Sequence, residues 1–216
     1  MNARAVLWDM DGTLVDSADY HSEAWHAVMV PRGVALTDEM FRSTFGQRND
    51  TILRIWCGQD ISDADIEEIS HAKEARYREL VAERGILLLP GIARRIAQLS
   101  DAGWHQAIAS AAPRANVEAI IAALDLASVV EAFVGGEDVV RGKPDPEVFR
   151  KAAERLGIAP EYCIVVEDAP AGVEAGLRAG MRVIGVGINH QKLPADRAAF
   201  SLDDLPDDVF EALLAR

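Results

Sequence analysis

The sequence predicts an α/β protein in which a doubly wound parallel sheet, a Rossmann-like core, carries an inserted all-helical domain. Short apolar runs alternate with helical segments along most of the chain. These runs are too continuous for a sheet with one wet face, and strands buried on both faces are typical of parallel sheets covered by helices. The expected strands are residues 5–8, 106–109, 132–134, 163–166 and 183–186.

The helices between these strands are predicted from apolar spacing and from residues that begin or end helices. Pro113 is expected to open a helix whose apolar residues recur with helical spacing up to Leu124. Asp145 and Pro146 supply an N-cap and a proline for the first helical position, and Gly157 ends that helix. Strands and helices that alternate in this way favour a doubly wound sheet.

A long block near the N-terminus interrupts this alternation. It contains no convincing strand, and its residues are typical of several helices, the longest from residue 62 to about residue 84. Because the block lies between the first strand and the next α/β unit, we expect it to be a helical cap inserted over the sheet. The predicted domains are a catalytic core of residues 1–15 and 88–216 and a cap of residues 16–87.

The composition limits the classes of partner. There are 35 acidic and 22 basic residues, so the formal net charge is −13. This balance argues against nucleic acid and against an anionic membrane surface, because both attract basic patches. No apolar run reaches membrane-spanning length, and Cys57 and Cys163 are expected to be buried free thiols. We expect a cytoplasmic protein that is a monomer or a weak homo-oligomer.

Polar residues follow the predicted strands at the points where the strands end. Ligands of open parallel sheets bind beyond the carboxyl ends of the strands, so these residues are candidates for one site. Clustered carboxylates repel one another unless a cation neutralises them, and Mg²⁺ prefers hard oxygen ligands. A metal and a lysine would supply the local positive charge that a phosphate needs on an acidic protein. The residues expected to converge are Asp9, Asp11, Ser110, Lys143, Glu167 and Asp168.

These residue types suit phosphoryl transfer. An ionised carboxylate can attack phosphorus and form an aspartyl-phosphate. A second carboxyl two residues later can protonate the leaving oxygen. Gly12 would let backbone amides approach the phosphoryl oxygens.

Four segments in order resemble the motifs of the haloacid dehalogenase superfamily. They are residues 9–15, Ser110, residues 142–146 and residues 165–172, and they span nearly the whole chain. The helical block after the first segment is similar to the C1 cap of the β-phosphoglucomutase-like branch. The dehalogenase branch itself is disfavoured, because Asp11 serves phosphoryl transfer.

The resemblance implies a role for each core residue. Asp9 would be the nucleophile and a metal ligand. Asp11 would be general acid and then general base, and would ligate the metal through its main-chain carbonyl. Ser110 would hydrogen-bond the phosphoryl group, and Lys143 would balance charge on the nucleophile and the phosphate. Asp168 would ligate Mg²⁺, and Glu167 beside it would do so either directly or through water.

Three cap residues are candidates for substrate binding. His21 follows a segment similar to one in the mutase branch, although a packed core histidine explains it equally well. Lys73 lies on an apolar helix stripe with Tyr77, and it either snorkels or, as in the mutase-like branch, reaches the active site. If Lys73 faces the cleft, its removal should raise KM and change stability little. Arg48 stands two residues after a glycine, where the mutase has an arginine three residues after one.

The favoured function is a Mg²⁺-dependent phosphatase of small phosphorylated metabolites, most simply sugar phosphates. The alternative is a β-phosphoglucomutase-type mutase, which His21 and Lys73 favour and which Pro113 and the shifted Arg48 oppose. A receiver-like signalling module also uses a phosphorylated aspartate, but it has no large cap after its first strand.

Overall fold

The computed structural model describes residues 3–215, so residues 1–2 and 216 of the predicted core lie outside the described residues. The described chain forms one sheet of six parallel strands in the order β3-β2-β1-β4-β5-β6. Each expected strand is present to within one residue at its ends. β6 was not predicted, because two residues are too short to carry a pattern. The strands are β1 Ala5–Trp8, β2 His105–Ala109, β3 Ala132–Val134, β4 Cys163–Glu167, β5 Arg182–Gly185 and β6 Arg197–Ala198.

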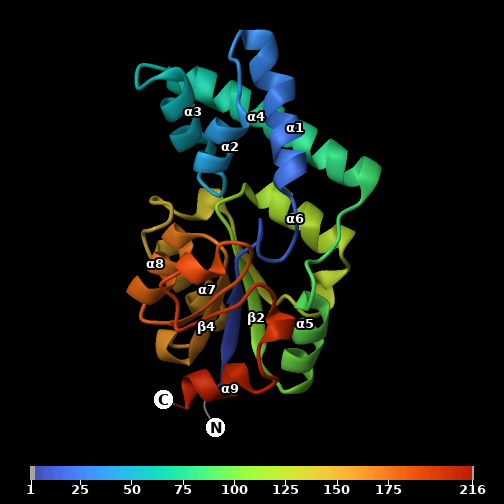
Figure 1. Cartoon of the computed structure of the whole chain (residues 1–216), viewed down its shortest axis with the longest axis vertical. Coiled ribbons are helices and arrows are strands. Elements are labelled where there is room, and N and C mark those ends of the chain that lie inside the picture. Colours follow the sequence, from blue (N-terminus) through green and yellow to red (C-terminus); the bar gives the residue numbers. More distant parts are fainter. Residues whose placement is uncertain (1–2, 216) are drawn as a thin grey trace.

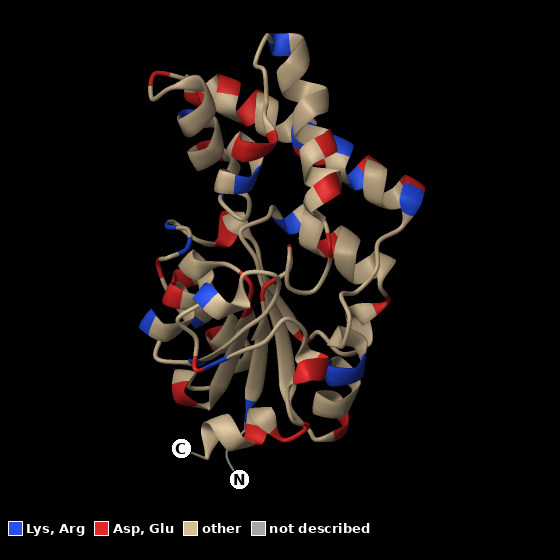
Figure 2. Cartoon of the chain, in the orientation of Figure 1, with Lys and Arg blue, Asp and Glu red and all other residues tan. Residues whose placement is uncertain are grey.

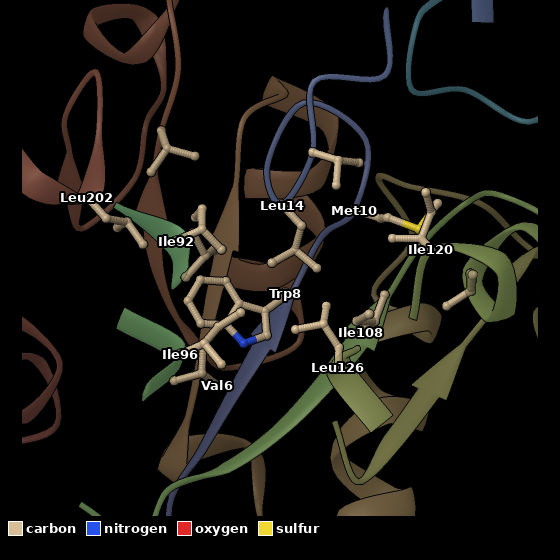
Figure 3. Packing of buried hydrophobic residues seen from close by; sticks show 14 of the residues in the cluster. Val6, Trp8, Met10, Leu14, Ile92, Ile96, Ile108, Ile120, Leu126 and Leu202 are labelled. Carbon is tan, nitrogen blue, oxygen red and sulfur yellow. The ribbon is translucent and has the colours of Figure 1, made fainter. Parts of the chain in front are cut away.

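Helices cover both faces of this sheet, as the alternating sequence predicts. Successive strand residues point to opposite faces, so Val6 and Trp8 pack against α5, α6 and α9, while Ala5 and Leu7 pack against α7 and α8. Figure 3 shows the Trp8 side chain beside Ile92 and Ile96 of α5. The core helices are α5 Ile92–Asp101, α6 Arg114–Ala123, α7 Glu147–Leu156, α8 Pro170–Arg178 and α9 Val209–Leu214.

The ends of these helices follow the expected chemistry with one shift. Pro113 stands just before α6, and Gly157 ends α7 in the left-handed conformation with φ 69°. Pro146 lies at the N-cap of α7, one residue earlier than predicted, because the Asp145 carboxylate accepts from the Glu147 N–H at 3.1 Å. Short 3₁₀ helices occupy Val30–Arg32, Leu126–Ser128, Gly136–Asp138, Pro160–Tyr162, His190–Lys192 and Leu202–Asp204.

A second body of four helices lies over the carboxyl ends of the strands, at the end of the molecule opposite both chain termini (Figure 1). Thr37 and Ser62 cap the second and fourth of these helices through their side chains. The helices have an apolar cluster of their own, built around Trp25, Met29 and Leu53. They are α1 Ala18–Met29, α2 Asp38–Thr44, α3 Asn49–Cys57 and α4 Asp63–Arg84.

The chain enters and leaves this helical body side by side. Val15 and Leu88 form an antiparallel bridge, and the Leu89 N–H donates to the Leu14 carbonyl at 2.8 Å. The Tyr20 hydroxyl donates to the Gly85 carbonyl at 2.8 Å, just beyond the bridge. The two crossings are therefore tied to each other by hydrogen bonds.

The remaining expectations from composition have mixed outcomes. Acidic positions are spread over the cap helices and the core alike in the view of Figure 2. Both cysteines are free, but only Cys163 is buried; Cys57 is exposed because it ends α3 beside the loop that starts at Gly58. Among residues 3–215, no helix is long and apolar enough to cross a membrane.

Candidate active site

The turn after β1 brings the first acidic segment against the end of β4. The Asp9 N–H donates to the Val166 carbonyl at 3.0 Å, which continues the pairing of the two strands. Gly12 then takes a φ of 87°, and a Cβ at this position would collide with the Asp168 carboxylate. The Thr13 hydroxyl donates to that carboxylate at 3.1 Å. The glycine is therefore what allows Asp168 to lie against this turn.

Lys143 joins the acids that end β1 and β4. Its ammonium donates to Asp9 Oδ1 and, at 2.8 Å, to Glu167 Oε1. The other Glu167 oxygen accepts from the Ala169 N–H at 2.6 Å, and Gly172 leaves the space in which this carboxylate lies. Both oxygens of Glu167 are thus engaged, which suits a residue that orients the lysine.

Three carboxylates surround one lysine, and the charges are unbalanced. Burial raises the pKa of Asp9 to about 7, against the lowering effect of Lys143, and the Glu167 charge adds to the rise. Burial also raises the pKa of Asp168 well above its usual value, and the charges of Glu167 and Asp9 raise it further. The cluster as a whole is therefore short of positive charge.

The same three carboxylates fit a divalent cation. Asp9, Glu167 and Asp168 each offer one oxygen, and these atoms lie within 4.8 Å of one another. All three ligand atoms are carboxylate oxygens, which hard cations such as Mg²⁺ prefer. A cation at this place would also offset the repulsion that, together with burial, raises the two pKa values.

Ser110 directly follows β2 and lines the same cavity as these acids. Its N–H donates to the Val134 carbonyl at 3.0 Å, and its hydroxyl accepts from the Ala112 N–H at 3.0 Å. The N-cap position of α6 belongs to Pro113, so Ser110 is not the cap of that helix. Its hydroxyl proton remains available to an acceptor in the cavity.

A cavity of about 950 Å³ separates the sheet from the helical body, and it is large enough for a phosphorylated sugar. Core and cap both contribute to its walls. The structure brings every residue predicted for the site to this cavity: Asp9, Asp11, His21, Arg48, Lys73, Ser110, Lys143, Glu167 and Asp168.

The Asp11 carboxylate is held by two residues at the start of α1, the N-cap residue Ser17 and His21. Its Oδ1 accepts from the Ser17 hydroxyl at 2.5 Å and contacts His21 Nε2 at 3.1 Å. Burial alone would raise the pKa of Asp11, but the neighbouring His21 and the Ser17 hydrogen bond together lower it. Ser17 was not singled out in the sequence, although it lies only two residues after the first motif.

His21 connects Asp11 to Lys73. The Lys73 ammonium lies 2.7 Å from His21 Nδ1, and the imidazole stacks on Tyr77 with ring centres 4.1 Å apart. A lysine ammonium has only donors, so Nδ1 must accept, and Nε2 carries the proton that faces Asp11. His21 is therefore part of a polar chain, in addition to being packed.

Lys73 is buried and paired, with 2 % of its surface exposed. Besides His21 it contacts Glu74 Oε1 at 2.8 Å, and it lies over the Trp25 ring at 5.2 Å. From the sequence we expected removal of Lys73 to change stability little. Because its removal would leave the Glu74 charge buried, we now expect a loss of stability. Glu74 was missed in the sequence, where an acid beside a lysine on a charged helix carries no distinctive signal.

Arg48 lies across the junction between the two bodies. Its Nη1 donates to the carbonyls of Gly136 and Val139 at 3.3 and 3.1 Å, and its Nε lies 3.4 Å from Asp50. The guanidinium thus borders the cavity but directs these donors to the core backbone.

Comparisons with known proteins agree with this geometry. Residues 3–180 match the family described as haloacid dehalogenase-like hydrolase. Hexitol phosphatase A of Escherichia coli is 36% identical over 207 residues, which cover 95% of this chain and 90% of that protein. Protein CbbY of Rhodobacter capsulatus is 33% identical over 85% of each chain. Beta-phosphoglucomutase of Bacillus subtilis is 31% identical over 94% of this chain and 91% of that protein.

Solved structures show the same architecture. CbbY from Rhodobacter sphaeroides in complex with phosphate superimposes with a TM-score of 0.82 at 31% identity, covering 92% of this chain and 94% of that one. A beta-phosphoglucomutase from Clostridium difficile has a TM-score of 0.88 at 24% identity and covers 99% and 97%, a likeness of fold.

Proposed function

The chain belongs to the haloacid dehalogenase-like hydrolase family, and we propose on that basis that it is a Mg²⁺-dependent phosphatase of small phosphorylated metabolites, most simply sugar phosphates. One observation carries the proposal: a lysine-bound aspartate, Asp9, lies beneath a cavity beside an acidic cluster, with Asp11 two residues away. Magnesium as the metal, an aspartyl-phosphate as the intermediate and the cytoplasm as the compartment are parts of this proposal.

The reaction would proceed in two displacements at phosphorus, with Asp9 as the nucleophile of the first and the leaving group of the second. A carboxylate oxygen of Asp9 attacks phosphorus, the bond to the alcohol oxygen breaks, and Asp11, which must enter this step protonated, gives that oxygen its proton and is left as a carboxylate. In the second step Asp11 takes a proton from water, the water oxygen attacks phosphorus, and the bond between phosphorus and the Asp9 oxygen breaks, which releases inorganic phosphate and restores Asp9 and Asp11. Ser17 and His21 would hold the Asp11 carboxylate at a fixed point for both transfers.

Charge in this site would be balanced by Lys143 and by the metal. Lys143 contacts the nucleophile directly and would also face the transferring phosphoryl group, with the Ser110 hydroxyl as a further donor. The cation would be held by Asp9, Asp168 and the main-chain carbonyl of Asp11, with Glu167 reaching it directly or through water. When bound, it supplies positive charge that stabilises the transferring phosphoryl group.

The four-helix body would act as a cap. Residues 16–87 would exclude bulk water from the cavity, and residues 1–15 and 88–216 would provide the catalytic core. A small phosphorylated metabolite is the partner that fits a cavity with cationic groups on an otherwise acidic chain.

A phosphatase fits these residues better than a mutase. A mutase must hold a second phosphate, yet Arg48 directs Nη1 to core carbonyls, and Ala111, Ala112 and Pro113 supply no side-chain donors after Ser110. The contact between His21 and Asp11 favours the alternative, a β-phosphoglucomutase-type enzyme, because controlling Asp11 could keep the phosphate from water.

Two assays run side by side test the proposal. Purified protein would be offered a panel of sugar phosphates with Mg²⁺ and with EDTA, and inorganic phosphate would be measured. In parallel, conversion of β-glucose 1-phosphate to glucose 6-phosphate would be followed in a coupled assay. We expect Mg²⁺-dependent phosphate release from at least one sugar phosphate. Isomer formation without phosphate release would establish the mutase instead.

A further inference from the structure

The Glu74 carboxylate collects donors from three helices at the junction between cap and core. Its Oε1 accepts from Lys73 Nζ at 2.8 Å and from Asn49 Nδ2 at 2.7 Å. Its Oε2 accepts from Asn116 Nδ2 at 2.5 Å. Glu74 is 5% exposed, so these donors replace water, and losing one of them leaves a buried charge short of a partner.

Asn116 is the member of this set that comes from the core. It lies on α6, is fully buried, and turns both ends of its amide toward α4. Nδ2 donates to Glu74, and Oδ1 accepts from Arg78 Nη1 at 2.8 Å, one helical turn further along. Because the donor and the acceptor of the Asn116 amide are both used, the amide has one orientation, and these two hydrogen bonds fix how α4 packs on α6.

The donors to Glu74 divide into two kinds. Lys73 and Asn49 belong to the helical body and stay with Glu74 wherever that body goes. The Asn116 hydrogen bond exists only when α4 lies against the core. Without it, the Glu74 carboxylate would draw the Lys73 ammonium more strongly, at the expense of the 2.7 Å contact between Lys73 and His21.

We propose that Asn116 is a positioning residue: it seats α4 on the core and, through Glu74, Lys73 and His21, fixes the side chain of Asp11. The role of Asp11 rests on the proposed function; the seating of α4 does not. Through this chain the proton-transferring group would be fully oriented only when the cap is seated over the substrate, so that proton transfer and exclusion of water coincide.

Asn116→Asp is the direct test, because it keeps the size of the side chain and the acceptor for Arg78 while removing the donor to Glu74. The probes are sorbitol 6-phosphate and p-nitrophenyl phosphate, each followed in a single turnover. We expect the rate with sorbitol 6-phosphate to fall by about tenfold or more, as for loss of a hydrogen bond to a charged group. The rate with p-nitrophenyl phosphate should fall less than about threefold, because its leaving group does not need the proton.

The double variant Asn116→Asp with Glu74→Gln reverses the hydrogen bond. The amide introduced on α4 would donate to the carboxylate introduced on α6, and the pair would keep one negative charge. We expect the double variant to recover most of the lost rate with sorbitol 6-phosphate. No recovery would mean that the tie between α4 and α6 is not what positions Asp11, and the inference would be overturned.

Amide hydrogen exchange of α4 tests the packing of α4 on the core independently of activity. Asn116→Asp should speed exchange in α4 and leave β1 and β4 unchanged, and the double variant should restore it. Glu23→Gln is the matched control, since it removes a surface ion pair between Glu23 and Arg84 of α4 without touching the core. The control should leave exchange and both rates within about twofold of wild type.

Two results would overturn the inference: equal rate losses with both substrates, which indicate a general structural effect, or unchanged exchange in α4. If Asn116→Asp does not fold, Arg78→Met frees the other end of the Asn116 amide and should give the same selective pattern at smaller size. A wild-type protein that releases no phosphate from any ester would defeat the proposed function, and the exchange experiment would still decide whether Asn116 seats α4.

Discussion

Two buried polar clusters meet at the cavity, and they differ in charge balance. The core cluster sets three carboxylates, those of Asp9, Glu167 and Asp168, against one lysine, and burial raises the pKa of Asp9 to about 7. In the cap cluster, which consists of His21, Asn49, Lys73 and Glu74 with Asn116 of the core, burial would likewise raise the pKa of Glu74, but Lys73, the neighbouring His21 and the hydrogen bonds lower it. One cluster lacks a cation; the other is satisfied by its own residues.

The difference in charge balance suits the two clusters to two different tasks. A cluster that is short of positive charge binds a cation and a phosphate strongly, because each newcomer relieves repulsion already present. A cluster whose hydrogen bonds are complete has a single arrangement and can fix the position of a neighbouring group. The core cluster is thus suited to chemistry at phosphorus, and the cap cluster to holding Asp11.

The largest effect is expected at the nucleophile. Asp9→Asn is nearly isosteric, so the fold should be kept, but turnover should fall by several, roughly four or more, orders of magnitude. Phosphate release and a thermal melt on the same sample measure both quantities. An Asp9→Asn protein with a tenth of wild-type activity would show that the core cluster does not supply the nucleophile.

The cap cluster should respond in stability as well as in rate. Lys73→Met keeps much of the aliphatic stem but leaves the Glu74 charge buried with only neutral partners. We expect the free energy of unfolding to fall by about 3 kcal/mol, as for breaking a buried ion pair. Urea denaturation checks this value. A loss below about 0.5 kcal/mol would instead describe a solvent-screened lysine, contrary to its burial.

The core cluster should respond in the opposite direction. In metal-free buffer, Asp168→Asn removes one of three mutually repelling carboxylates and keeps an acceptor for the Thr13 hydroxyl. We expect this variant to be more stable than wild type by about 1 kcal/mol, and to lose activity. Added Mg²⁺ should raise the melting temperature of wild type more than that of the variant. A variant less stable than wild type without metal would contradict the charge imbalance.

The smallest effect is expected for a charge pair outside both clusters. Glu23 lies on the surface of the cap and contacts Arg84 and Arg76. Glu23→Gln should change the free energy of unfolding only slightly, because water screens exposed pairs. Equal losses for Glu23→Gln and Lys73→Met, measured by the same denaturation, would remove the distinction between buried and exposed charges.

The two clusters also differ in how far the sequence predicts them. Asp9 and Asp168 directly follow strands, and the position of a strand end is set by a continuous apolar run that the sequence displays. The contact between Glu74 and Asn116 joins a helix of the cap to a helix of the core through two residues that are 42 positions apart in the sequence. It depends on how the cap rests on the core, which no local pattern encodes.

Other differences have similar physical causes. β6 is two residues long and is formed by pairing with β5, so its own residues give no period. Cys57 is exposed because of where a short helix ends, and helix ends are the least certain part of a periodic pattern. The role of Arg48 in joining the cap to the core carbonyls depends on the same docking.

The bridge between Val15 and Leu88 has a consequence for the modularity of this architecture. Because the insertion starts and stops at adjacent points, the core chain path would be nearly the same if a short turn replaced everything between them. Closing a longer loop costs little extra entropy, about 0.6 kcal/mol for each doubling of its length. Evolution can therefore exchange or enlarge the inserted segment without redesigning the sheet beneath it.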